Sequence, residues 1–192
     1  HPMDQGMARE LLGLPSGKRL LLFGALNVTD KRKGIDYLIE ALRRMEKQDV
    51  ELVVFGQVKD DIRGLFPVPI HSMGYLSDES KIVALYNAVD MFITSSLEEN
   101  LPNTIMESMA CGTPCVGFEI GGIPEMIDHR VNGYVANYKD AGDLANGIQW
   151  VLEHEDRLAL SDACVKKVQE NYTEEMVAKQ YTALYEKLLK GE

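Results

Sequence analysis

The stretch from Met91 to Phe118, MFITSSLEENLPNTIMESMACGTPCVGF, decides the fold. It opens and closes with short apolar runs, Met91 to Thr94 and Pro114 to Phe118, each of the length expected for a buried strand. Between them the sequence predicts a helix that begins at Pro102, because proline is favoured at a first helical position, and ends before Gly112. A strand, a helix and a second strand in this order are typical of a parallel sheet.

The same alternation of apolar and amphipathic runs continues on both sides of this stretch. Further strands are predicted at Leu20–Leu26, Glu51–Phe55, Pro69–Met73 and Gly133–Ala136, and helices at Ile35–Met45, at Asp78–Ala88 with Ser77 as its cap, at the single turn Pro124–Ile127, and two or three times within 141–190. Buried strands that alternate with helices predict an α/β protein, a Rossmann-like doubly wound parallel sheet with a C-terminal helical tail. We expect one domain over residues 1–192.

The terminal helix, expected at Glu174 to Leu189, carries apolar residues at helical spacing along one side. These residues are Met176, Val177, Tyr181, Leu184, Tyr185 and Leu188. We expect this side to pack on something outside the domain.

Composition and charge exclude several classes of function. The chain carries 20 basic and 30 acidic side chains, and its net charge of −10 repels nucleic acid phosphates, so no nucleic-acid partner is expected. No apolar run approaches the ~18 residues of a membrane span. The histidines lack the spacing of metal ligands. We expect Cys111, Cys115 and Cys164 to be buried reduced thiols of a cytoplasmic protein.

Two carboxylates, Glu99 and Glu107, flank the predicted start of the helix at Pro102. On one helix they would lie ~12 Å apart at 1.5 Å per residue, which is beyond the separation used by the carboxylate pairs of glycoside hydrolases. A ligand that enters between them would instead meet the free amides of the helix N-terminus and a carboxylate on each side, as phosphates and sugar hydroxyls require. The alternative is a charged helix face with a chance spacing.

The loop that follows the first strand, NVTDKRKG, ends with Arg32, Lys33 and Gly34 at the mouth of the next helix. Two cations and a helix N-terminus can hold a diphosphate. Taken alone, a turn of this kind is more often only a solvated loop. The absence of a GxGxxG motif after this strand argues against a dinucleotide redox enzyme.

The segment ENLPNTIMESMACGTPCVGFEIGGIPEMI, residues 99–127, closely resembles the E-x7-E segment of retaining glycosyltransferases with two Rossmann-like domains, the GT-B architecture of glycosyltransferase family 4. The resemblance covers most of the chain. It extends to FGALNVTDKRKGIDYLIEAL near the start, the VFG strand end, HSMGYLSDESKIVALYNAVDMFITSSLEEN and the VNGYV element.

The resemblance implies roles for individual residues. Glu107 matches the glutamate that binds the ribose hydroxyls of the nucleotide, and Glu99 the one near the donor sugar and its transferred carbon. Lys33 matches the basic residue that holds the diphosphate. Gly74 and Tyr75 match the backbone beside the base.

Two departures from the family pattern bear on these roles. Relatives often carry an arginine directly after the glycine of the first strand, but here Ala25 follows Gly24, itself expected at the donor site. We expect Arg32 to supply the missing cation.

In the second departure, Pro102 stands where relatives often have a glycine, and proline has no N–H. The amides that follow Asn100, those of Leu101, Asn103 and Thr104, are therefore expected to contact the sugar and phosphate. The Asn103 side chain is a further candidate contact.

The resemblance implies transfer of a sugar from a nucleoside-diphosphate sugar to a hydroxyl of a glycan or lipid-linked acceptor, with retention and without a metal or cofactor. Asp60-Asp61 is not the D-x-D metal signature of the other large glycosyltransferase architecture. The acceptor would bind to an N-terminal domain that this chain lacks, so we expect donor binding but negligible turnover. The full-length enzyme is expected in the cytoplasm, with the inner membrane as a peripheral location.

Two alternatives remain open at this point: a sugar-nucleotide-binding module without transferase activity, and a related GT-B enzyme such as an epimerase or a phosphorylase. The turn formed by Gly121, Gly122 and Glu125 matches the family's GG-x-PE element near the cleft. A tight structural turn explains it equally well.

Overall fold

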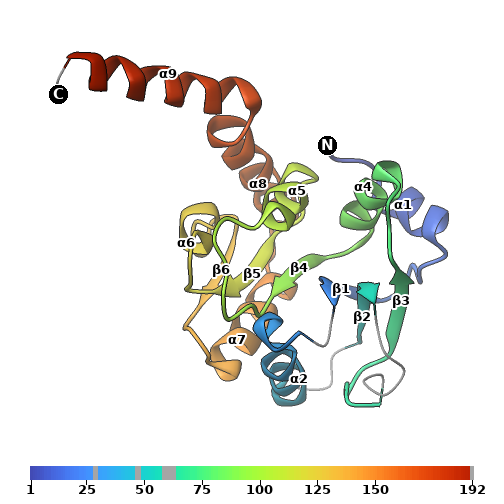
Figure 1. The fold of residues 1–192 in the computed structure, drawn as a ribbon. Coiled ribbons are helices and arrows are strands. Elements are labelled where there is room, and N and C mark those ends of the chain that lie inside the picture. The colour runs from blue at the N-terminus through green and yellow to red at the C-terminus, as the bar shows by residue number, and fades with distance from the viewer. Residues whose placement is uncertain (28–29, 46–48, 58–63, 191–192) are drawn as a thin grey trace.

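The structure, a computed structural model, describes residues 1–27, 30–45, 49–57 and 64–190 (Figure 1). Part of the predicted diphosphate loop, residues 28–29, and the Asp60-Asp61 pair lie outside the described residues. The described chain forms a sheet with helices on both faces.

The sheet has six parallel strands in the order β3-β2-β1-β4-β5-β6. Their bounds are β1 Arg19–Asn27, β2 Val50–Gln57, β3 Ile70–Gly74, β4 Met91–Thr94, β5 Cys115–Phe118 and β6 Gly133–Ala136. This order confirms the predicted doubly wound α/β fold. Each predicted strand is present within two residues of its expected ends.

The central strands carry apolar side chains on both faces of the sheet. Along β1, Leu20 and Leu22 face one core cluster while Leu21 and Phe23 face the other, and all four are buried. Successive side chains of a strand point to opposite faces, so a continuous apolar run is stable only in a sheet that is covered on both sides.

Helices supply that cover. The described helices are α1 Gln5–Leu12, α2 Ile35–Arg44, α4 Glu79–Ala88, α5 Asn103–Ala110, α6 Ile123–Met126, α7 Ala141–Leu152, α8 Arg157–Asn171 and α9 Glu174–Lys190. α2 and α7 pack together on one face of the sheet, and α1, α4, α5 and α8 cover the other.

The strand order reverses at β1, which pairs with β2 on one side and with β4 on the other. Chain connections leave β1 and β4 in opposite directions there, which opens a crevice at their carboxyl ends. The loops that follow β1 and β4 therefore meet at this crevice, as predicted.

Two local predictions were wrong, and one helix was missed. α4 is capped by Asp78, which accepts from the Ser80 amide at 3.0 Å, and not by Ser77. Pro102 is the residue before α5, with an extended backbone (φ −71°, ψ 114°), and not its first residue. The helix α1 was not expected at all.

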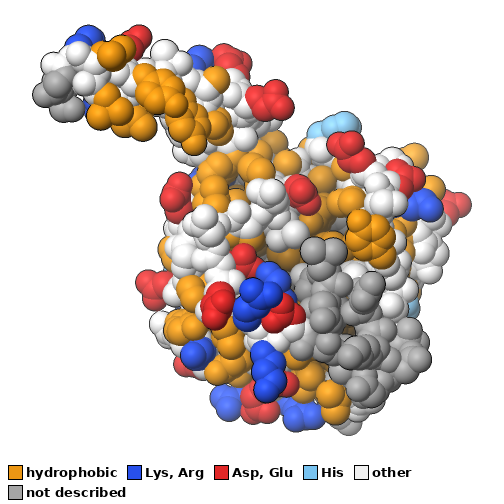
Figure 2. Space-filling model, viewed as in Figure 1, with side chains coloured by type: hydrophobic (Ala, Val, Ile, Leu, Met, Phe, Trp, Pro, Cys, Tyr) orange, Lys and Arg blue, Asp and Glu red, His pale blue; other side chains and the backbone are white. Residues whose placement is uncertain are grey.

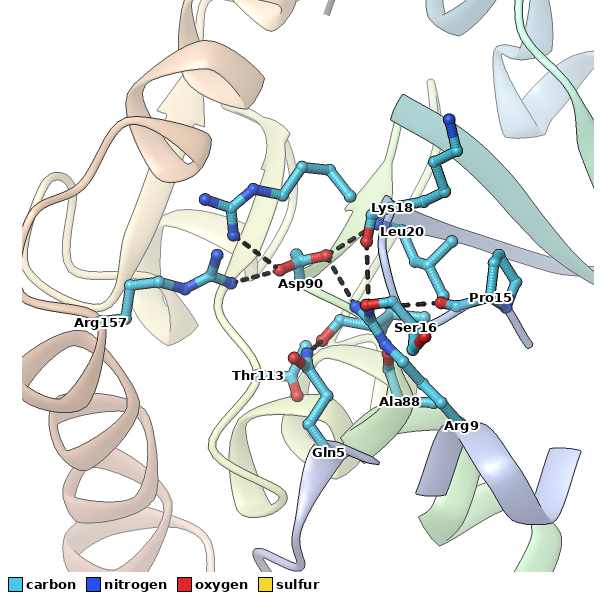
Figure 3. Close-up of polar contacts among 12 residues, drawn as sticks. Gln5, Arg9, Pro15, Ser16, Lys18, Leu20, Ala88, Asp90, Thr113 and Arg157 are labelled. Carbon is cyan, nitrogen blue, oxygen red and sulfur yellow. Dashed lines mark hydrogen bonds and ion pairs between the residues drawn. The ribbon is translucent and has the colours of Figure 1, made fainter. Parts of the chain in front are cut away.

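α1 is held to the domain by a buried ion-pair network at the opposite end of the sheet from the crevice (Figure 3). Arg9 on α1 donates to the Asp90 carboxylate at 3.0 Å, and Arg157 and Arg19 pair with the same carboxylate at 2.6 and 3.3 Å. Asp90 also accepts from the Leu20 amide at 2.7 Å. One aspartate thus joins α1, β1 and α8.

α9 extends away from the sheet (Figure 1), and none of its residues is buried. Its large apolar side chains are exposed, and Figure 2 shows hydrophobic side chains along it. The exposed members are Tyr181, Leu184, Tyr185, Leu188 and Leu189. That this side covers another part of a longer protein stays a prediction.

Candidate functional site at the carboxyl ends of β1 and β4

A short 3-10 helix, Lys31–Lys33, lies on the β1 side of the crevice. Asp30 caps it, and Gly34 ends it with a positive φ of 60°. A Cβ on Gly34 would lie 1.9 Å from the Ser95 carbonyl oxygen of the loop after β4. Glycine is therefore required both for its backbone angle and for the close approach of the two loops.

Two hydrogen bonds join these loops. The Ser95 hydroxyl donates to the Lys33 carbonyl at 2.9 Å, and the Leu97 amide donates to the Arg32 carbonyl at 2.7 Å. The basic turn and the loop that leads to α5 are thus one structural unit, although more than 60 residues separate them in sequence.

Lys33 and Glu99 meet across the crevice, with 2.6 Å between Nζ and Oε1. Their side chains are 32% and 15% exposed. They line a cavity of about 420 Å³ together with Arg32, Glu98 and Asn100. Basic and acidic side chains lie next to each other on this face of the molecule (Figure 2). Lys33 and Glu99 are therefore in direct contact, and their roles toward a donor stay predictions.

Arg32 points its guanidinium at Asp30, with 2.7 Å between Nη2 and Oδ2. The hydrogen bond from Arg32 holds the pKa of the Asp30 carboxyl below its ordinary value. Arg32 lines the same cavity as Lys33. Asp30 therefore already balances much of the charge that Arg32 would offer to a diphosphate. The role of Arg32 as the substitute cation stays a prediction.

The N-terminus of α5 opens on the same loop and has no side-chain cap. Pro102 precedes it and offers no N–H, so the first amides of the helix, those of Asn103 and Thr104, lack the usual capping acceptor. Leu101 and Asn103 are exposed. These amides have no side-chain acceptor, and their contact with an anionic ligand stays a prediction.

Glu107 lies one turn inside α5 and is exposed, and one of its carboxylate oxygens accepts a hydrogen bond from the neighbouring helix α4. The Tyr86 hydroxyl on α4 donates to Glu107 Oε2 at 3.1 Å. Burial, together with the nearby carboxylate, raises the pKa of Tyr86 far above its ordinary value, so the phenol stays a donor. Sequence reasoning missed Tyr86 because nothing local links it to a residue 21 positions away.

Gly24 has a packing role that the sequence did not reveal. A Cβ at this position would lie 1.9 Å from the Phe55 ring on the neighbouring strand. Gly74 ends β3 with a φ of 64°, and Tyr75 after it is largely exposed. Because β3 is the edge strand, a ligand that reaches Tyr75 from Lys33 must cross the end of β2.

The turn Gly121-Gly122 packs against the backbone of the loop before α5. A Cβ on Gly121, which has a φ of 54°, would lie 2.1 Å from the Glu99 carbonyl oxygen. The Gly122 amide donates to the Asn100 carbonyl. The glycines are thus structurally required and they also support the candidate site, so both interpretations of this turn have a basis.

Within the described ranges, no group of three or more His, Cys, Asp or Glu residues is arranged to hold a metal ion. The same part of the chain contains no helix that is long and apolar enough to cross a membrane. All three cysteines are free and buried, as predicted.

Solved structures of similar fold are glycosyltransferases of the GT-B architecture and their C-terminal domains. Sucrose-phosphate synthase of Thermosynechococcus elongatus matches with a TM-score of 0.80 and 24% identity over 100% of this chain and 50% of that chain. The C-terminal domain of a glycosyl transferase group 1 family protein of Francisella tularensis matches with a TM-score of 0.73 and 20% identity over 91% of this chain and 96% of that one. An Anabaena protein, HepE, solved with UDP-glucose, has a TM-score of 0.72 and 26% identity over 88% of this chain and 49% of that chain.

Among curated proteins, an uncharacterized glycosyltransferase of Methanocaldococcus jannaschii is 28% identical over 187 residues, which are 92% of this chain and 47% of that protein. The chain thus spans about half the length of this relative. The sequence model of the family described as glycosyl transferases group 1 matches residues 17–154. The chain therefore belongs to the glycosyl transferases group 1 family, with the fold of a GT-B C-terminal domain.

Proposed function

We propose that this chain binds a nucleoside-diphosphate sugar at the carboxyl ends of β1 and β4, and that the longer protein transfers the sugar to an acceptor hydroxyl with retention. The observation that carries the proposal is the contact between Lys33 and Glu99, which line one cavity at the strand-order reversal, on the loop that leads to the uncapped N-terminus of α5. The fold similarity to a protein solved with UDP-glucose supports the class of ligand.

Lys33 is proposed to hold the diphosphate. The charge of Lys33 is balanced by Glu99, and the four charged side chains of the cavity, two basic and two acidic, sum to zero. An entering diphosphate must therefore draw the ammonium group away from Glu99. The first amides of α5 add partial positive charge without a competing cap.

Glu99, once released from Lys33, is proposed to accept hydrogen bonds from hydroxyls of the donor sugar. Glu107, which lies in α5, is proposed to accept hydrogen bonds from the ribose hydroxyls. The base is then proposed to lie beside Gly74 and Tyr75. A donor in this orientation crosses from the edge strand to the crevice. This is the path that the strand order makes available.

In the proposed transfer, the bond between the anomeric carbon and the phosphate oxygen breaks as the acceptor oxygen bonds to the same face of that carbon. The acceptor proton passes to the departing phosphate oxygen, so the configuration is retained without a protein nucleophile. Lys33 and the α5 N-terminus stabilise the negative charge that develops on the diphosphate. Glu99 orients the donor and does not attack it, and no cofactor is invoked.

A thermal-shift panel of UDP-glucose, GDP-mannose and ADP-glucose tests donor binding, because a ligand that binds only the folded chain raises its Tm. We expect one of these donors to raise the Tm of the wild-type chain and to raise that of Glu107→Ala much less. Equal shifts in the two proteins would contradict the ribose assignment. No shift with any donor would contradict the proposed function.

Transfer itself is tested with the full-length protein, where the 192-residue chain serves as the matched control. We expect donor consumption by the full-length protein only when an acceptor is present, and negligible turnover by the chain alone. Conversion of the donor without acceptor would indicate an epimerase. Binding without any turnover would indicate a binding module.

A further inference from the structure

Among the described residues, Tyr86 is a buried phenol whose hydroxyl contacts Glu107 of the candidate site. Its side chain is 1% exposed, yet its hydroxyl ends at the exposed carboxylate of Glu107, 3.1 Å from Oε2. A buried hydroxyl needs a hydrogen-bond partner, and this one finds it in a residue already proposed to contact ligand.

Three contacts fix the orientation of Tyr86. Its ring stands edge-to-face against Phe55 of β2, with centroids 6.4 Å apart, and against Phe92 of β4, with centroids 6.1 Å apart. Its backbone carbonyl accepts from the Thr113 hydroxyl at 2.7 Å. The ring therefore has little freedom to turn, and its hydroxyl points from α4 at the Glu107 carboxylate on α5.

Gly24 completes this arrangement. The Phe55 ring occupies the space that a side chain at position 24 would need, since a Cβ there would lie 1.9 Å from it. Phe55 in turn contacts Tyr86. A line of contacts thus runs from β1 through β2 and α4 to the carboxylate on α5.

We propose that Tyr86 is a positioning residue that makes the site selective for a nucleotide with an intact ribose. The phenol occupies one face of Oε2 and holds the Glu107 carboxylate in a single orientation, in which its remaining lone pairs accept from the two neighbouring ribose hydroxyls. This inference rests on the proposed function, in which Glu107 binds the ribose.

The consequence is a difference between ribose and 2′-deoxyribose ligands. A fixed carboxylate loses a charge-assisted hydrogen bond when the 2′-hydroxyl is absent, and such bonds are worth roughly tenfold in affinity or more. A carboxylate that is free to rotate can turn both oxygens to the remaining hydroxyl or to water. Discrimination between the two ligands then falls even when overall binding persists.

The test is calorimetric titration of the 192-residue chain with UDP, GDP and ADP, followed by the 2′-deoxy form of whichever binds most tightly. The wild-type chain is expected to bind the deoxy form about tenfold more weakly. Tyr86→Phe, which keeps the ring and removes only the hydroxyl, is expected to reduce that ratio to less than about threefold.

Tyr134→Phe is the matched control, because it removes the same group from another phenol–carboxylate pair, in which Tyr134 donates to Asp143 at 2.9 Å away from the site. It should leave the ratio unchanged. In a Glu107→Ala background, Tyr86→Phe should not change the ratio further, because Tyr86 acts through that carboxylate.

The possible failures can be told apart. If none of the three diphosphates binds the wild-type chain, the proposed function is wrong and the role of Tyr86 with it. If one binds and the wild-type ratio is near one, or Tyr86→Phe weakens both ligands equally and leaves the ratio at its wild-type value, donor binding survives and the inference about Tyr86 is overturned.

Discussion

Replacement of Lys33 by methionine removes the cation proposed to hold the diphosphate while it keeps most of the side-chain volume. Lys33 Nζ lies 2.6 Å from Glu99 Oε1, and the lysine side chain is 32% exposed. The substitution therefore changes the charge of the cavity by one unit and leaves a carboxylate there that repels an entering anion.

The expected magnitude follows from these two effects. At ~4 Å and an effective dielectric constant of ~20, two unit charges interact by ~4 kcal/mol. Part of this is offset in the wild type, because Lys33 must first leave Glu99. We therefore expect a net loss of about 1.5–3 kcal/mol, typical of a hydrogen bond to a charged group, or roughly 10- to 100-fold in Kd.

The assay is calorimetric titration with the diphosphate that binds the wild-type chain most tightly. Lys31→Met is the matched control, because Lys31 belongs to the same 3-10 helix but does not line the cavity. It should change the Kd less than threefold. A Kd for Lys33→Met within twofold of wild type would refute the assignment of the diphosphate to Lys33.

Glu99→Gln is expected to change the affinity for the same diphosphate in the opposite direction. It removes the carboxylate that competes for Lys33, so the diphosphate without a sugar should bind more tightly, by about three- to tenfold. Weaker binding of the diphosphate would show that Glu99 does not compete with it for Lys33.

The remaining predictions concern other parts of the chain. Arg32→Ala should weaken donor binding if Arg32 replaces the absent cation. If Arg32→Ala leaves the donor Kd unchanged while Lys33→Ala raises it, Arg32 does not have that role. Gly121→Val should lower both Tm and donor affinity, since its Cβ would collide with the Glu99 carbonyl; a donor Kd equal to wild type would separate the turn from the site. Asp90→Asn should cost about 3–5 kcal/mol in urea unfolding, because it removes a carboxylate that three guanidiniums share, and a loss below about 1 kcal/mol would show that the network is not needed. Burial raises the pKa of the Cys115 thiol from 9.0 to about 12, so its contribution to stability should be full below about pH 9 and decline as pH rises towards 12; a stability that rises over this range would contradict the sign.

The fold could be predicted because central strands such as β4 and β5 are short and buried along their whole length. The run Met91–Thr94, for example, coincides with β4 without change. Helix ends were less secure, because neighbouring residues such as Ser77 and Asp78 are both good caps and only tertiary position decides between them. α1 was missed although Asp4 and Gly13 are cap signals at its two ends, whereas the contact between Arg9 and Asp90, 81 residues apart, could not be predicted.

The site, too, could be predicted only in part from the sequence. Lys33 and Glu99 could be placed together because the carboxyl ends of β1 and β4 must meet where the strand order reverses. Tyr86 could not be found in this way, since its hydrogen bond to Glu107 depends on how α4 packs beside α5. The donor-site role of Gly24 stays a prediction, and the Phe55 ring that requires a glycine there becomes visible only in the folded sheet.

The central claim is that a nucleotide sugar binds at the crevice between β1 and β4, and backbone amide NMR shifts during titration with UDP-glucose, GDP-mannose and ADP-glucose test it most directly. We predict that at least one of these donors shifts the amides of residues 32–34, 99–101 and 103–104 most strongly. The amides around Asp90, at the other end of the sheet, should stay in place. Saturable shifts centred on that far end, or no saturable shift with any of the three donors, would contradict the account.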